Sequence, residues 1–200
     1  MKEIGRIKLV QIQRSSLKQG ERLHTYYDPA PILGVQRLLL APGGVIALTE
    51  DQGEIMDLHH ADHPTTHNSK GLNGVSLGFT THYQAMRAQF GEHIIDGIAG
   101  ENILVETDRV FALADLGSQI VIENQHTGQR VYLTNIEVAD PCVEFTNFAV
   151  NHGPSLPAAE LKAALQFLDG GRRGFYARAT EQKTPIVIQT GDKVYIDEGE

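Results

Sequence analysis

Residues 130–148, RVYLTNIEVADPCVEFTNF, combine the clearest strand pattern of the chain with its only cysteine. Between Val131 and Val138 the stretch is rich in β-branched residues, and apolar and polar positions roughly alternate. This pattern is typical of a strand with one buried face. Pro141 lacks an amide hydrogen and favours extended geometry at the residue before it, so strand pairing should stop there. We therefore expect Cys142 at the end of a strand.

The segment just before this strand predicts its partner. Residues 119–123, QIVIE, form a second β-branched run, and the polar residues 124–129 separate it from the first. We predict an antiparallel hairpin. Further strands are expected at residues 4–12, 35–40, 45–49, 75–79, 103–106, 186–188 and 193–196, with a Pro-Gly-Gly hairpin turn at residues 41–44.

Two segments carry helical signals instead. One begins with a capping-box pattern at Thr81 and Gln84 and ends at Gly91. The other is predicted over Ser155–Asp169, where leucines and alanines line one face and a pair of glycines follows. Helices are therefore a minority, and we expect them to pack against a sheet.

The composition indicates one β-rich domain. Two hundred residues suffice to bury a sizeable core, and the chain has twenty glycines and no tryptophan. With many short strands and few helices, the predicted fold is a single domain over residues 1–200. Its class is mainly β: a closed or partly closed antiparallel β-barrel with two or three packing helices.

The charge balance restricts the partners. Seventeen basic and twenty-five acidic residues give a net charge of −8, which argues against a nucleic-acid-binding protein. Arg172, Arg173 and Arg178 form the one local concentration of positive charge. Its scale suits a phosphate or carboxylate group on a small ligand.

The cysteine count and the apolar segments bear on the compartment. A single cysteine excludes an internal disulfide framework, and the first residues contain no apolar segment long enough for a signal peptide. No stretch of the sequence has the length and apolar character of a membrane span. We therefore expect a cytoplasmic protein without membrane contact, whose thiol is reduced.

A histidine-rich loop follows the first strands. His59, His60, His63 and His67 fall within nine positions, but Pro64 interrupts any helix that would align them. Neither a helical zinc-protease spacing nor a cysteine pair is present, so zinc is not the expected cofactor. We predict a polar loop at the mouth of a pocket. His59 or His60 would bind a ligand or transfer a proton there.

Cys142 can be interpreted in two ways from its neighbours. A free cysteine is often a small buried hydrophobe, and the flanking Asp140 and Glu144 disfavour the thiolate. A reactive thiol would need a nearby cation or a bound metal, since coordination deprotonates a thiol. From these residues alone, packing is the simpler role.

Four stretches, in order along the chain, resemble the MOSC domain, the family named for the C-terminal domain of molybdenum cofactor sulfurase. The resemblance covers about residue 56 to the end of the chain, and the first fifty residues are less diagnostic. The four stretches are GIAGENILVE (97–106), VYLTNIEVADPC (131–142), GRRGFYARA (171–179) and GDKVYI (191–196).

This resemblance implies a β-barrel, a standalone family member, and a role connected with molybdenum cofactor. It makes Cys142 the catalytic residue and the ligand of the molybdenum ion. The family also carries pyridoxal phosphate binding among its implied properties. Many relatives have a His-Gly-Gly-Pro-Asp stretch where this chain has His59-His60-Ala61-Asp62-His63-Pro64. The residues implied to bind the cofactor are Gly100, Glu101, Asn102, Arg173, Arg178, His59 and His60.

Three hypotheses follow. In the first, the chain binds the pterin cofactor through Cys142 and reduces N-hydroxylated compounds with electrons from a donor protein. In the second, Cys142 carries sulfur as a persulfide that is exchanged with a sulfur-donor protein, and Arg173, Arg178 or a protonated His59 supplies the cation. In the third, a barrel without catalytic activity binds a small ligand, and Cys142 only packs.

Overall fold

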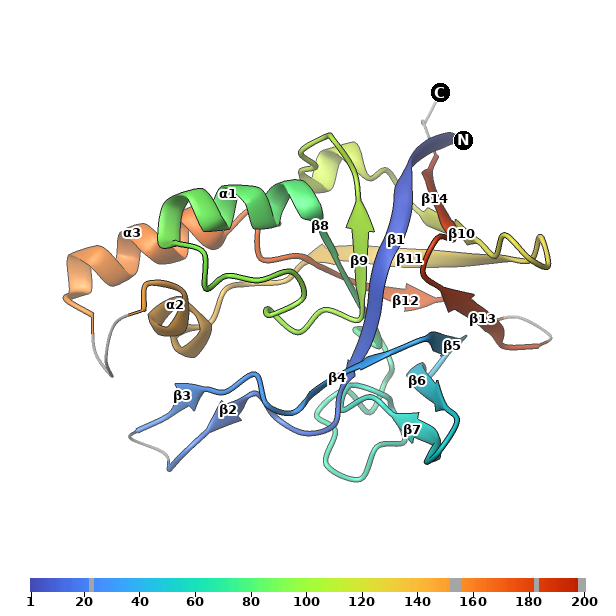
Figure 1. Cartoon of the computed structure of the whole chain (residues 1–200), viewed down its shortest axis with the longest axis horizontal. Helices are drawn as coiled ribbons and strands as arrows, with labels where there is room; N and C mark the ends of the chain where they lie inside the picture. Colours follow the sequence, from blue (N-terminus) through green and yellow to red (C-terminus); the bar gives the residue numbers. More distant parts are fainter. Residues whose placement is uncertain (22–23, 152–155, 182–183, 198–200) are drawn as a thin grey trace.

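A closed ring of β-strands forms the centre of the molecule (Figure 1). The computed structural model describes residues 1–21, 24–151, 156–181 and 184–197. Within these residues seven strands close the ring. In spatial order they are β1 (Lys2–Gln13), β14 (Lys193–Ile196), β10 (Ile120–Glu123), β11 (Arg130–Val138), β12 (Phe175–Ala179), β8 (Val75–Phe79) and β9 (Ile103–Glu106), which pairs again with β1.

The predicted barrel is confirmed, and so is the predicted hairpin, in which Ile120 pairs with Leu133 and Glu123 with Arg130. All neighbours in the ring are antiparallel except β8 and β9, which run parallel. Parallel neighbours need a long crossover, and helix α1 (Thr80–Phe90) lies within the connection between these two strands. The barrel is therefore antiparallel apart from this one pair, which the sequence did not predict.

Alternating burial along the strands fills the barrel. Every second residue of β12 is buried, from Phe175 through Ala177 to Ala179, and Val131 and Leu133 of β11 are buried in the same way. In β8 all five residues are buried: Val75, Leu77 and Phe79 belong to the barrel core, and Ser76 and Gly78 lie against Asn102 and Glu101. This packing provides the apolar burial that stabilises the fold.

A second sheet shares the barrel core. It consists of β13 (Ile186–Gln189), β5 (Arg37–Ala41), β6 (Gly44–Thr49) and β7 (Gly53–Met56). Leu38, Val45 and Ile188 belong to the same apolar cluster as the barrel strands. The predicted Pro-Gly-Gly turn does join two paired strands, β5 and β6. The remaining short elements are β2 (Lys18–Gln19), β3 (Tyr26–Tyr27), β4 (Ile32–Val35) and the 3-10 helix η1 (Leu113–Asp115).

Three helices gather on one side of the barrel (Figure 1). They are α1, α2 (Val143–Ala149) and α3 (Ala158–Leu168), and they enclose a second apolar cluster that includes Tyr83, Phe145 and Leu168. None of the described helices is long and apolar enough to cross a membrane.

The helix boundaries differ from expectation in three places. The capping box at Thr81 does not form, because α1 begins at Thr80 and the Thr81 hydroxyl donates to the Arg109 carbonyl at 2.8 Å. Helix α3 begins after Pro157, and Ser155 lies outside the described residues. Helix α2 was not predicted, and Cys142 is its N-cap residue.

Candidate functional site

A cleft of about 420 Å³ opens between the barrel, the histidine loop and the start of α2. Cys142, Arg173 and His59 all line it, together with side chains from the end of β1 and from the β2–β3 hairpin. These residues come from distant parts of the chain. The cleft therefore brings the thiol together with members of two other predicted groups, the arginines and the histidines.

Cys142 reaches the cleft because the chain turns from β11 into α2 at this residue. Its side chain is half-buried, and its Sγ accepts a hydrogen bond from the Phe145 amide at 3.4 Å. The Thr146 hydroxyl donates to the Cys142 carbonyl at 2.8 Å and fixes the same turn. These two bonds fix the position of the sulfur atom at the cleft.

Arg173 supplies a partly buried positive charge in the cleft. Its guanidinium carbon lies 4.9 Å from the centre of the Phe145 ring, a cation–π contact. Burial alone would lower the pKa of Arg173, but the neighbouring tyrosine hydroxyls and the Glu101 carboxylate more than offset this and raise it. Arg173 is therefore a permanent cation, suited to an anionic group of a ligand.

Two tyrosine rings form an apolar wall of the cleft. Tyr27 and Tyr176 both line the cleft. The Tyr27 ring meets the Phe145 and Phe148 rings, each at 5.1 Å between centroids, and its hydroxyl donates to the Ile98 carbonyl at 2.6 Å. Burial raises the pKa of Tyr27 well above its ordinary value, so this hydroxyl stays protonated.

His59 is held at the cleft by a buried carboxylate. Its Nδ1 lies 3.0 Å from Asp57 Oδ1, and the Asp57 side chain is fully buried. The His59 side chain keeps 31% exposure. Its ring centroid lies 6.5 Å from that of Tyr176. A charged group buried in this way orients the imidazole ring.

Two other predicted residues do not line the cleft. His60 is buried under the β5–β6 turn, so close that a Cβ on Gly43 would lie 2.9 Å from its ring. Burial lowers the pKa of His60, so the ring is neutral at pH 7. Arg178 lies on β12 two residues beyond Tyr176, outside the cleft lining.

The predicted loop Gly100-Glu101-Asn102 lies behind the cleft and does not line it. Glu101 and Asn102 are each 1% exposed. Gly100 has φ +86°, and a Cβ there would meet Leu17 Cδ1 at 2.5 Å, so only glycine fits. These residues therefore act on the cleft through the side chains that they support.

Glu101 lies buried beneath the residues that line the cleft. The Tyr83 hydroxyl donates to Glu101 Oε2 at 2.8 Å, whereas Oε1 is buried without a hydrogen-bond partner among the described residues. Burial raises the pKa of Glu101, and the positive charge of Arg173 opposes the rise. Glu101 and Arg173 are thus coupled electrostatically.

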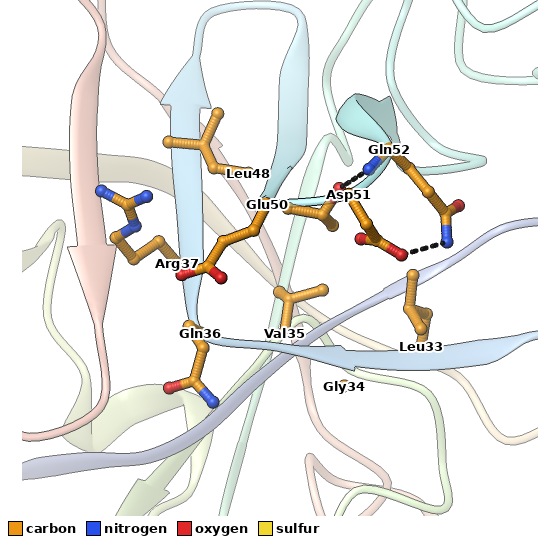
Figure 2. Close-up of a pocket in the computed structure, with 10 residues that line it drawn as sticks. Leu33, Gly34, Val35, Gln36, Arg37, Leu48, Glu50, Asp51 and Gln52 are labelled. Carbon is orange, nitrogen blue, oxygen red and sulfur yellow. Dashed lines mark hydrogen bonds between the residues drawn. The ribbon is translucent and has the colours of Figure 1, made fainter.

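A second hollow, of about 330 Å³, lies between β4 and the β6–β7 turn (Figure 2). Arg37, Glu50 and Asp51 are its charged residues, and no cysteine or histidine lines it. No group of three or more metal-binding side chains was found in the described part of the chain. The Cys142 cleft is therefore the stronger candidate for chemistry.

Several cleft residues were not predicted. Lys18, Tyr176 and His67 also line the cleft, and Asp57 supports it from behind. His67 belongs to the predicted histidine loop, but the sequence did not indicate a separate role for it. Asp57 stands two residues before His59, a spacing that allows an Asx-type turn and could have suggested the pair.

The chain is similar to known proteins at two levels. A family model described as the MOSC domain matches residues 73–195. In fold, the chain is similar to the crystal structure of the YuaD protein from Bacillus subtilis, with 15% identity, a TM-score of 0.57, and coverage of 95% of this chain and 93% of that one. A second solved structure, described as a hypothetical protein, has 10% identity and a TM-score of 0.52, and the coverage is 94% and 67%. Comparison with curated proteins gave no match.

Proposed function

Because the chain belongs to the MOSC domain family, which is associated with molybdenum cofactor, we propose that the cleft binds this cofactor and that Cys142 is the protein ligand of the metal. One observation carries the proposal: the only thiol of the chain is half-buried in a cleft that also contains a permanent cation, Arg173. A thiolate suits a metal, and a guanidinium suits the anionic pterin phosphate.

The donor set fits a metal that arrives with its own ligands. In the described residues Cys142 does not belong to any group of three or more side chains that could hold a metal ion without further ligands. A metal bound there would take its remaining ligands from the cofactor. The Phe145 amide, which donates to Sγ, would hold the thiolate in place before binding.

When bound, the cofactor would supply electron-transfer chemistry, and the protein residues would position the reactants. Arg173 would hold the phosphate, and Tyr27 and Tyr176 would form an apolar wall that restricts water. The proposed reaction is the reduction of N-hydroxylated compounds with electrons from a partner protein. Fold alone does not fix this activity, so the reaction must be tested separately from binding.

Two arginines offer a matched test of the binding mode. Arg173 lines the cleft, whereas Arg178 lies on β12 outside it. After anaerobic purification from a cofactor-producing host, Arg173→Lys should retain at least tenfold less molybdenum than the native chain, because a lysine cannot reproduce the bidentate contact. Arg178→Lys should retain the native amount. Equal retention by both variants would refute the assigned role of Arg173.

A persulfide on Cys142 is the second candidate function. The same amide hydrogen bond and the nearby Arg173 would stabilise a sulfur anion without any metal. Intact-mass spectrometry of protein isolated with a sulfur donor tests this function. A chain that gains one sulfur atom and loses it on reduction would support a sulfur carrier, and an unmodified chain would exclude it under those conditions.

A further inference from the structure

Four side chains form a continuous hydrogen-bonded path from strand β8 to the cleft. Asn102 bonds to Ser76 of β8 and to Asp57, and Asp57 bonds to His59. Ser76, Asn102 and Asp57 are all buried, and His59 alone reaches the cleft. The path links the barrel wall to one imidazole ring.

The orientation of the Asn102 amide is fixed at the start of this path. Its Oδ1 lies 2.9 Å from the Ser76 backbone nitrogen, which can only donate. The amide nitrogen, Nδ2, therefore faces the other way, 2.9 Å from Asp57 Oδ2 and 3.2 Å from the Gln11 carbonyl. Asn102 is thus a donor to Asp57.

Asp57 accepts hydrogen bonds at both oxygens. Oδ2 receives the Asn102 amide and the Gln13 backbone N–H, the latter at 2.7 Å, and Oδ1 receives the His59 backbone N–H at 2.8 Å. Three certain donors around one buried carboxyl group indicate the ionised form, which can only accept. The fourth partner, the Nδ1 atom of His59 at 3.0 Å, must then donate.

This bonding selects one tautomer of His59. With the hydrogen on Nδ1 directed at Asp57, the neutral ring carries its lone pair on Nε2, which has no hydrogen-bond partner among the described residues. The ring position is also held by the Asp57–His59 turn and by the bond from Asn68 Nδ2 to the His59 carbonyl at 2.8 Å. His67, which also lines the cleft, makes no such bond to a carboxylate in the described structure.

We propose that Asp57 and His59 form a proton-transfer dyad that serves the ligand bound beside Cys142. His59 Nε2 takes a proton from an oxygen or nitrogen atom of the ligand, or returns one to it. Nδ1–H stays bonded to Asp57 throughout, and the carboxylate stabilises the imidazolium form. Asn102 is a positioning residue, because it acts only through Asp57. The proton-transfer role of His59 rests on the proposed function of the cleft, whereas the Nδ1–H tautomer of His59 does not depend on it.

The tautomer is tested by NMR on the protein as isolated, with ¹⁵N-labelled histidine. Neutral His59 should show a protonated Nδ1 and an unprotonated Nε2. In Asp57→Asn this preference should be lost, and in Asp62→Asn it should persist. Asp62 is the matched control because its side chain is 81% exposed and neighbours His60, 3.9 Å away. A native His59 protonated at Nε2, or an unchanged tautomer in Asp57→Asn, would overturn the dyad.

The catalytic role has its own test. In His59→Gln, turnover of an N-hydroxylated amidine per bound molybdenum should fall by about 10²–10⁴-fold. If Asp57→Asn does not fold, the turnover of His59→Gln and the tautomer of His59 in the native protein test the dyad instead. Native turnover in His59→Gln would overturn the role. If the native chain itself retains no molybdenum, the proposed function fails, and the tautomer result is judged independently.

Discussion

Cys142 caps helix α2, a position that serine fills at least as well. In Cys142→Ser the hydroxyl can take the hydrogen bond from the Phe145 amide, so the free energy of unfolding should change by less than about 1 kcal/mol. Chemical denaturation of the two metal-free proteins measures this. A larger loss of stability, with activity per folded molecule unchanged, would instead assign Cys142 to packing.

Gly100 is a residue whose replacement should disturb the fold behind the cleft. Its φ of +86° is strained for any other residue, and an added Cβ would lie 2.5 Å from Leu17 and 2.8 Å from Gln13. Gly100→Ala should lower the free energy of unfolding by about 2–5 kcal/mol. Gly128→Ala is the control, since φ there is +67° but no atom lies within 4 Å. Equal losses in the two variants would show that the close contacts do not matter.

Among single residues, the sequence predicted Cys142 and Arg173, which line the cleft, but not the buried hydrogen bonds that position His59. Cys142 and Arg173 could be found because rare or clustered residue types mark them. The spacing of Asp57 and His59 allows their pairing, but the bonds from Asp57 to Gln13 and Asn102, which are 44 and 45 positions away, could not be predicted. Likewise, only the folded chain distinguishes His59, which faces the cleft, from His60, which packs under a turn.

The β2–β3 hairpin is attached to helix α2 through Glu144. Lys18 Nζ lies 3.2 Å from Glu144 Oε2, and the Thr25 hydroxyl donates to Oε1 at 3.0 Å. Glu144→Gln should therefore speed amide hydrogen exchange in the hairpin, while global stability falls by at most about 1 kcal/mol because Lys18 is half exposed. Glu160→Gln, on the exposed face of α3, is the control. Unchanged exchange rates in Glu144→Gln would contradict this attachment.

The same attachment should depend on pH. Burial alone would raise the pKa of Glu144, but hydrogen bonds from its own amide, Thr25 and Lys18 lower it below the ordinary 4.5. A lowered folded-state pKa means that the stabilisation is present above pH 4.5 and is lost as the pH falls through the folded value. The protection factors of the hairpin amides, corrected for the intrinsic pH dependence of exchange, should therefore fall in the native chain as the pH falls through the folded value, and should change less in Glu144→Gln.

Among the elements, long strands and hairpins were predictable, and helix α2 was not. Strand β11 and its partner β10 carry a clear alternation of burial that the sequence already displays. Helix α2 has only seven residues, and such short helices are stable only through tertiary contacts. Its buried Phe145 packs against Tyr27, far away in sequence, which a local pattern does not reveal.

Closure of the barrel depends on the turn before β14. Asp192 is 1% exposed, and its carboxylate accepts the Gln125 and Gln189 amides at 3.0 and 2.9 Å. Asp192→Ala leaves both amides without these partners and should lower the free energy of unfolding by about 2–5 kcal/mol. Asp51→Ala, in an exposed turn, should change it by less than about 0.5 kcal/mol. Thermal unfolding compares them, and similar values would contradict the role of Asp192.

For the whole molecule, the barrel class followed from many short strands with glycine-rich turns, and the parallel pair did not. The connection between β8 and β9 contains helix α1, and the strand direction it imposes depends on which strands become neighbours. Local patterns do not fix that choice. The second sheet was also unforeseen: three of its strands, β5, β6 and β13, match predicted strands, and β7 was not predicted.

The most direct test of the proposed function is the molybdenum content of the native chain and of Cys142→Ser. Both proteins are purified anaerobically from a host that makes ample cofactor, and metal is measured per folded chain. The account predicts close to one molybdenum for the native chain and almost none for the variant, with both equally folded. Equal molybdenum in the two proteins, or none in either, would contradict metal ligation by Cys142.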